Sequence, residues 1–169
     1  VIDWTFFFKA WEMKGRYPAL LEDPVQGNEA KKLLADDQAL IKEIVDGKLL
    51  TVNAVIGFYP ASSANDNISV FDPETPEKKI ATFHFLRNLQ IRENNQHNPC
   101  LADFIAPADS DIKDYLGLFA VTAGIGIESL TEKYKKSGND YLAIMSKILA
   151  DRLAEAAAEW LHFMVRTEW

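Results

Sequence analysis

Cysteine is almost absent from this sequence: Cys100 is the single thiol among 169 residues. One thiol cannot form a disulfide within the chain, and a lack of disulfides is typical of proteins from the reducing cytosol. We therefore expect a cytoplasmic protein. The three histidines, His84, His97 and His162, show no ligand spacing with Cys100, so we expect no metal site.

Long apolar runs and an excess of positive charge are missing as well. No apolar run approaches the roughly 18 residues that a membrane span needs, and no signal-peptide pattern is present. The net charge is −7, whereas a general nucleic-acid binder would carry a basic stripe. We expect neither a membrane nor a nucleic acid as partner.

Nucleotide-binding and metalloprotease motifs are also lacking: there is no P-loop, G-x-G-x-x-G, C-x-x-C or H-E-x-x-H. Residues 122–126 (TAGIG) lie between an expected strand and an expected helix, as a phosphate loop does. They lack the third glycine of the dinucleotide fingerprint. Glycines here are better suited to a tight turn or to a close approach of the backbone to a ligand.

Residues 139–169 contain neither glycine nor proline and are rich in helix formers, so they predict one long helix. Residues 137–140 (SGND) supply the break and the N-cap. At about 100° per residue, one face is apolar: Leu142, Met145, Leu149, Leu153, Ala156, Ala157, Trp160, Met164. The opposite face is polar: Asp151, Glu155, Glu159, His162, Arg166. We expect this helix to form one wall of any site.

The rest of the chain changes its hydrophobic period twice. A short helix capped by Asp3 and a helix over 28–47 come first, and a short helix over 128–136 precedes the long one. Strands are expected between them: 52–60, 68–72, 80–89 (or strand-to-helix), 101–107, 115–122, with turns at 62–67 and 73–76 and a polar loop at 94–99. Short connections predict antiparallel pairing. Helices, then strands, then helices indicate an α+β fold.

The carboxylates leave two interpretations open. Asp151, Glu155 and Glu159 are like charges at i,i+4 spacing, which slightly destabilises an isolated helix. They form either a solvated face, which composition favours, or the wall of a polar cleft that holds a cation or hydrogen-bond donors. Asp3 is either an N-cap, which the local sequence favours, or a partner for the ammonium group of a ligand.

Four segments resemble one protein family in the right order: 2–23 (IDWTFFFKAWEMKGRYPALLED), 55–61 (VIGFYPA), 100–107 with 115–124, and 151–166 (DRLAEAAAEWLHFMVR). They are similar to the activation domain of cobalamin-dependent methionine synthase. The motifs Asp-Trp-Thr near the start and Asp-Arg-Leu-Ala-Glu on the long helix carry most of the resemblance.

The resemblance implies a C-shaped helical layer around a twisted antiparallel sheet. It implies a reactivation module that presents S-adenosylmethionine to cobalamin, held by a separate cobalamin-binding domain, while a flavodoxin-type donor supplies an electron. The module would contribute proximity rather than acid–base chemistry, so the chain alone is not expected to be catalytic. Two alternatives are a stand-alone activation-domain-like binding protein without turnover and an unrelated α+β binding module.

Site residues follow from the same resemblance. Asp3 matches the carboxylate that pairs with the ammonium group of S-adenosylmethionine, and Glu155 matches an acidic position near that ligand. Asp151 resembles a residue on the surface facing cobalamin, proposed to engage the histidine released from cobalt on docking.

The chain departs from the family pattern in one respect. An arginine-proline-alanine-proline-glycine-tyrosine-proline segment that contacts the ligand does not occur before Trp169. We therefore expect residues 1–169 to be a single activation domain truncated at its C-terminal end, with weak or absent ligand binding in isolation. One basic cluster could receive an acidic electron donor: Lys9, Lys14, Arg16, Lys31, Lys32.

Overall fold

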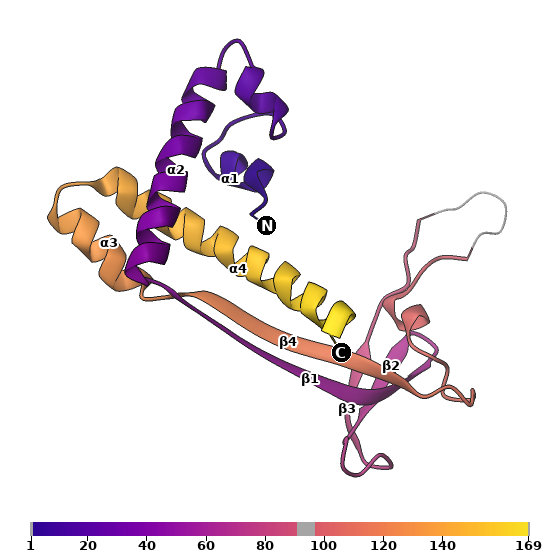
Figure 1. The fold of residues 1–169 in the computed structure, drawn as a ribbon. Helices are drawn as coiled ribbons and strands as arrows, with labels where there is room; N and C mark the ends of the chain where they lie inside the picture. Colours follow the sequence, from indigo (N-terminus) through magenta and orange to yellow (C-terminus); the bar gives the residue numbers. More distant parts are fainter. Residues whose placement is uncertain (1, 91–96, 169) are drawn as a thin grey trace. The chain divides into compact units, whose positions relative to one another are not determined.

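The computed structural model describes residues 2–90 and 97–168 (Figure 1). Its main elements are α1 (Trp4–Ala10), α2 (Gly27–Gly47), β1 (Thr51–Ala64), β2 (Asn67–Phe71), β3 (Lys79–His84), β4 (Asp114–Ile125), α3 (Ile127–Lys136) and α4 (Asp140–Glu168). The described residues also include the short 3₁₀ helices η1 (Ala19–Glu22) and η3 (Leu101–Phe104). The predicted α+β order is confirmed. The chain forms two compact units, Val1–Ala54 with Val121–Trp169 and Val55–Ala120.

The four strands form one sheet in the order β3-β2-β1-β4. The β1–β2 and β2–β3 pairs are antiparallel, as short connections predict. The turn expected at 62–67 is shorter than predicted, because β1 continues to Ala64. Ser63 is paired on both backbone groups, to Ala106 and Ala108, which extends the strand. The turn itself uses Asn65 at φ +53°, a conformation that asparagine tolerates.

Two strand predictions in the second unit are wrong. Residues 101–107 do not form a strand, because Leu101–Phe104 form the 3₁₀ helix η3. The Asp103 carboxylate accepts a hydrogen bond of 2.8 Å from the Cys100 backbone N–H, and such local bonds compete with strand pairing. The third strand ends at His84, and no helix follows it up to residue 90. The expected loop at 94–99 lies partly outside the described residues.

The helices of the first unit surround one hydrophobic core. Its buried members come from every helix of that unit: Phe7, Phe8, Leu20, Ala30, Leu33, Leu40, Ile44, Leu130, Tyr134, Ala143, Met145, Leu149. The predicted long helix is confirmed as α4, but its apolar face is buried only as far as Ala150. Trp160, which sequence periodicity placed on the buried face, is 57% exposed. The second half of α4 is therefore not part of this core.

The second unit has a smaller core of its own. Ala61, Ile68 and Val70 from the β1–β2 hairpin pack with Cys100 and Ala102. Cys100 is buried and is not part of a disulfide. No helix of the described chain is long and apolar enough to cross a membrane.

Gly126 makes the turn between β4 and α3. It has φ +104°, and a Cβ at this position would lie 2.4 Å from the backbone oxygen of Leu49. The tight turn predicted for the 122–126 segment is confirmed, and the close approach at Gly126 is to the backbone of Leu49.

Candidate functional site

Asp3 caps helix α1. Its Oδ1 accepts hydrogen bonds from the backbone N–H groups of Thr5 (2.8 Å) and Phe6 (3.3 Å), so the N-cap interpretation is confirmed. Within the described residues, Oδ2 accepts no hydrogen bond, and the side chain is exposed. The second oxygen is therefore oriented by the cap and available to an external donor.

An aromatic ring next to Asp3 connects α1 to α4. Two cations lie near the face of the Phe6 ring: the Lys9 ammonium is 4.7 Å from the ring centroid, and the Arg152 guanidinium is 5.9 Å from it. Arg152 Nη2 in turn lies 2.5 Å from Asp151 Oδ2. The first turn of α1, which Asp3 caps, therefore lies in one packed group with Asp151 of α4.

Asp151 and Glu155 lie one helical turn apart on the exposed side of α4. At i,i+4 spacing their Cβ atoms are roughly 5–6 Å apart. Glu155 makes no hydrogen bond or ion pair with other described residues. The structure thus brings Asp3 and Asp151 to adjoining helices of one unit, while Glu155 follows along α4. Neither of the two cavities described next is lined by any of these three carboxylates.

The first unit has a cavity of about 360 Å³ between α2 and α4. Its acidic side chains already have partners: the Tyr141 hydroxyl donates to Asp36 at 3.0 Å, and the Tyr134 hydroxyl donates to Glu43 at 2.9 Å. Hydrogen bonds from Lys133 and Tyr134 lower the pKa of Glu43. These hydrogen bonds stabilise the packing of α2 against the following helices, and both carboxylate oxygens of Glu43 are engaged in them.

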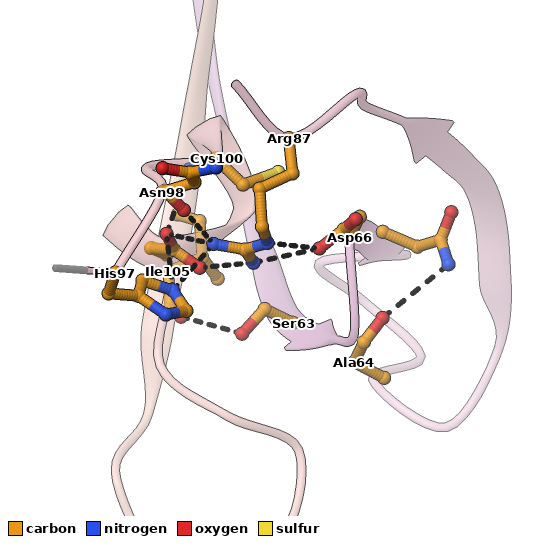
Figure 2. A network of polar contacts seen from close by, with 10 residues as sticks. Ser63, Ala64, Asp66, Arg87, His97, Asn98, Cys100 and Ile105 are labelled. Atoms are coloured by element: carbon orange, nitrogen blue, oxygen red, sulfur yellow. Dashed lines mark hydrogen bonds and ion pairs between the residues drawn. The ribbon is translucent and has the colours of Figure 1, made fainter. Parts of the chain in front are cut away.

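The second unit contains a dense polar network around Arg87 (Figure 2). The guanidinium binds Asp103 through two bonds of 2.8 Å and Asp66 through bonds of 3.0 and 2.7 Å. It also donates to the Asn98 carbonyl and approaches His97 Nε2, both at 2.6 Å. The hydrogen bonds from Arg87 hold the pKa of Asp103 well below its usual range. The network ties the 97–103 segment to the β1–β2 turn.

A cavity of about 580 Å³ lies beside this network, lined in part by Asp103 and Asp109. Two of its polar groups serve the fold: Asp103 is bound to Arg87, and the Ser63 hydroxyl donates to the Ile105 carbonyl at 2.8 Å. Within the described residues, no group of three or more His, Cys, Asp or Glu could hold a metal ion. We assign the network a structural role.

Replacement of Arg87 by lysine should loosen the 97–105 segment without unfolding the protein. Lysine keeps the positive charge but cannot form the paired bonds to Asp103. Hydrogen–deuterium exchange should show faster exchange of the Cys100 and Ile105 amides at pH 7, with a melting temperature lower by several degrees. Because the folded-state pKa of Asp103 is depressed, wild type should melt at a higher temperature than Arg87→Lys above pH 4, and this difference should shrink as the pH falls.

Lys78→Ala, which removes a 3.6 Å surface ion pair to Asp72, is the control and should change neither measurement. Unchanged exchange in the lysine variant would contradict this role.

Asp37 of α2 is fully buried, and neither carboxylate oxygen has a hydrogen-bond partner in the described structure. Burial raises its pKa to about 7. The indole N–H of Trp11 is likewise buried and unpaired there, and the Trp11 ring lies 5.5 Å from the Tyr141 ring. Sequence reasoning missed Asp37, although its spacing was informative.

The five basic residues proposed as a docking cluster are all exposed in the first unit. Two of their charged side chains already contact other described residues: Lys31 pairs with Glu22 at 3.0 Å, and Lys9 lies over Phe6. The cluster stays a prediction.

Comparison with known proteins decides the family. The model for "Vitamin B12 dependent methionine synthase, activation domain" matches residues 1–169. The chain belongs to this family. A solved structure described as "Crystal Structure of the MetH Reactivation Domain bound to AdoHcy" is similar to this activation domain, with 42% sequence identity and a TM-score of 0.88 over 99% of the chain. The chain spans about half, 51%, of that solved chain. The similarity therefore concerns the matched half of the solved chain and says nothing of its other half.

Proposed function

We propose that this chain is the reactivation module of a cobalamin-dependent methionine synthase, which presents S-adenosylmethionine to cobalamin held by another domain of the enzyme. The observation that carries the proposal is the 42% identical structure with AdoHcy bound. AdoHcy is what remains of S-adenosylmethionine after its methyl group has left, so a pocket that binds one fits most of the other.

The chain's own residues fit the amino-acid end of that ligand. Among the described residues nothing donates to Asp3 Oδ2, and the two backbone bonds to Oδ1 hold the carboxylate in place. A preoriented anion loses little entropy when it binds an ammonium group, and the resulting bond is charge-assisted. We propose that Asp3 binds the ammonium group, that Glu155 adds negative charge near the ligand, and that Asp151 faces the cobalamin-binding domain.

The module needs no acid–base group, because its task is to hold the sulfonium methyl group near its acceptor. Cobalamin, when bound by its own domain, supplies the methyl acceptor, and a flavodoxin-type protein supplies the electron. We propose that the parent enzyme is a 5-methyltetrahydrofolate–homocysteine methyltransferase. A cytoplasmic location fits both this reductive step and the single cysteine.

Asp3→Asn should weaken binding of S-adenosylmethionine by the enzyme that contains this chain. Asparagine keeps the N-cap but removes the negative charge, and a hydrogen bond to a charged group contributes about 1.5–3 kcal/mol, so the dissociation constant should rise roughly 10- to 100-fold. Titration calorimetry measures this change, and thermal unfolding should be unaltered.

Asp23→Asn is the matched control. Asp23 accepts backbone bonds from Val25 and Gln26 in the same way that Asp3 accepts its own. The control should bind with wild-type affinity. Equal binding by wild type and Asp3→Asn would remove Asp3 from the site, while wild-type enzyme that shows no heat of binding would favour an activation-domain-like binding protein without turnover.

A further inference from the structure

The ion pair between Asp151 and Arg152 is not a product of helix geometry. Neighbouring residues on a helix point about 100° apart and do not face each other. The 2.5 Å contact between Arg152 Nη2 and Asp151 Oδ2 therefore requires the arginine side chain to bend back toward the preceding residue. Something other than α4 itself must favour that conformation.

Contact with α1 supplies that support. The Arg152 side chain is only 17% exposed, against 71% for Asp151. Its guanidinium lies 5.9 Å from the centre of the Phe6 ring, and attraction between a cation and an aromatic face strengthens as water is excluded. Arg152 is thus held by α1, whereas Asp151 depends on Arg152 for its orientation.

Only one oxygen of Asp151 is used. Arg152 binds Oδ2, and within the described residues Oδ1 has no partner. A carboxylate that is fixed through one oxygen presents the other in a defined direction, as carboxylates do when they orient a histidine from behind a metal centre.

We propose that Arg152 is a positioning residue for docking: anchored on Phe6, it holds Asp151 so that Oδ1 accepts a hydrogen bond from an imidazole N–H of the cobalamin-binding domain. This inference rests on the proposed function. Phe6 also donates its backbone N–H to Asp3, so one turn of α1 supports both the ligand carboxylate and the docking carboxylate.

A double-mutant cycle tests this role. The chain and its variants are titrated into an isolated cobalamin-binding module of a methionine synthase that carries cob(II)alamin. The visible spectrum reports release of the cobalt-bound histidine. Asp151→Asn and Arg152→Ala should each weaken docking about tenfold, as is typical when a partner of a charged hydrogen bond is removed. The double variant should dock no more weakly than Asp151→Asn alone.

Two further variants guard against loss of folding. Arg152→Lys keeps the positive charge but lacks the planar set of N–H donors of the guanidinium. It should therefore restore part of the docking lost in Arg152→Ala. Phe6→Leu removes the aromatic support while the backbone N–H to Asp3 remains, and it should weaken docking only when Asp151 is present. Thermal unfolding of each variant shows whether the fold is intact.

Several outcomes would overturn the assignment. Losses that add in the double variant would show that Arg152 acts on docking independently of Asp151, and wild-type docking by both Arg152→Ala and Phe6→Leu would remove any role for the pair. If Asp151→Asn alone docks like wild type, Asp151 does not face the partner and Arg152 has nothing to position. A wild-type chain that leaves the histidine on cobalt would instead contradict the proposed function itself.

Discussion

Asp37→Asn should make the protein more stable at pH 8 and remove a pH dependence that the wild type shows between about pH 4 and pH 7. The carboxylate is fully buried without a partner, and burial raises its pKa from 3.8 to about 7. Burial of an unpaired charge is unfavourable, and the group responds by remaining protonated in the fold.

The sign follows from linkage. Between the two pKa values the folded protein binds one proton more than the unfolded chain, so the free energy of unfolding falls as the pH rises. Below pH 4 both states are protonated and there is no penalty. Above pH 7 both are ionised, and the rise of the pKa from 3.8 to about 7 corresponds to a penalty of about 4 kcal/mol.

Asparagine has nearly the same shape and does not ionise, so urea unfolding at pH 8 should show a gain of about 3 kcal/mol over wild type. The two proteins should converge at pH 4. Asp46→Asn is the control: Asp46 lies on the same helix, is exposed and pairs with Lys42, so its removal should change stability by less than about 0.5 kcal/mol at either pH. Parallel profiles for Asp37→Asn and wild type would show that Asp37 is not buried as an acid.

The spacing of α2 contained the signal that sequence reasoning overlooked. The buried positions of this helix include Ala30, Leu33, Asp37, Leu40 and Ile44, spaced 3, 4, 3 and 4 residues apart. The amphipathic pattern predicted the helix and its apolar face, and the same period places Asp37 on that face. An acidic residue at a position that the helical period places on the buried face is informative, because it predicts either a buried partner for the carboxylate or a raised pKa.

Other features could not be predicted from spacing. The contact between Phe6 and Arg152 joins residues that are far apart in sequence, and no local pattern indicates it. The Asp3 cap was predictable because capping depends on residues within one turn. The helix η3 was mistaken for a strand because its deciding bond, from the Cys100 amide to the Asp103 carboxylate, competes with a pattern of apolar residues that suits either structure.

The polar face of α4 has a charge pattern that fits two different roles. Periodicity correctly placed Asp151 and Glu155 on the exposed side of the helix. It could not distinguish a solvated face from a docking face, because both are charged and exposed in a chain without its partner. The family resemblance, rather than the charge pattern, separates the two interpretations, and only the docking and binding measurements proposed above test them.

Gly126→Ala should cause a large loss of stability that its positive φ alone does not explain. The glycine has φ +104°, and an added Cβ would lie 2.4 Å from the Leu49 backbone oxygen. An unfavourable backbone conformation costs about 1–3 kcal/mol, and an overpacked contact adds about 1–3 kcal/mol. Backbone cannot rotate away as a side chain can, so the segment before β1 or the start of α3 must move.

Gly138→Ala separates the two effects, because Gly138 has φ +71° but no atom within 4 Å of an added Cβ. This control should lose about 1 kcal/mol, the conformational cost alone. Urea unfolding should give Gly126→Ala a loss of about 3 kcal/mol or more, and the excess over Gly138→Ala reports the contact with Leu49 together with the less favourable φ of +104°. Equal losses would mean that the approach of Gly126 to Leu49 contributes nothing, and that the turn between β4 and α3 requires glycine only for its backbone angle.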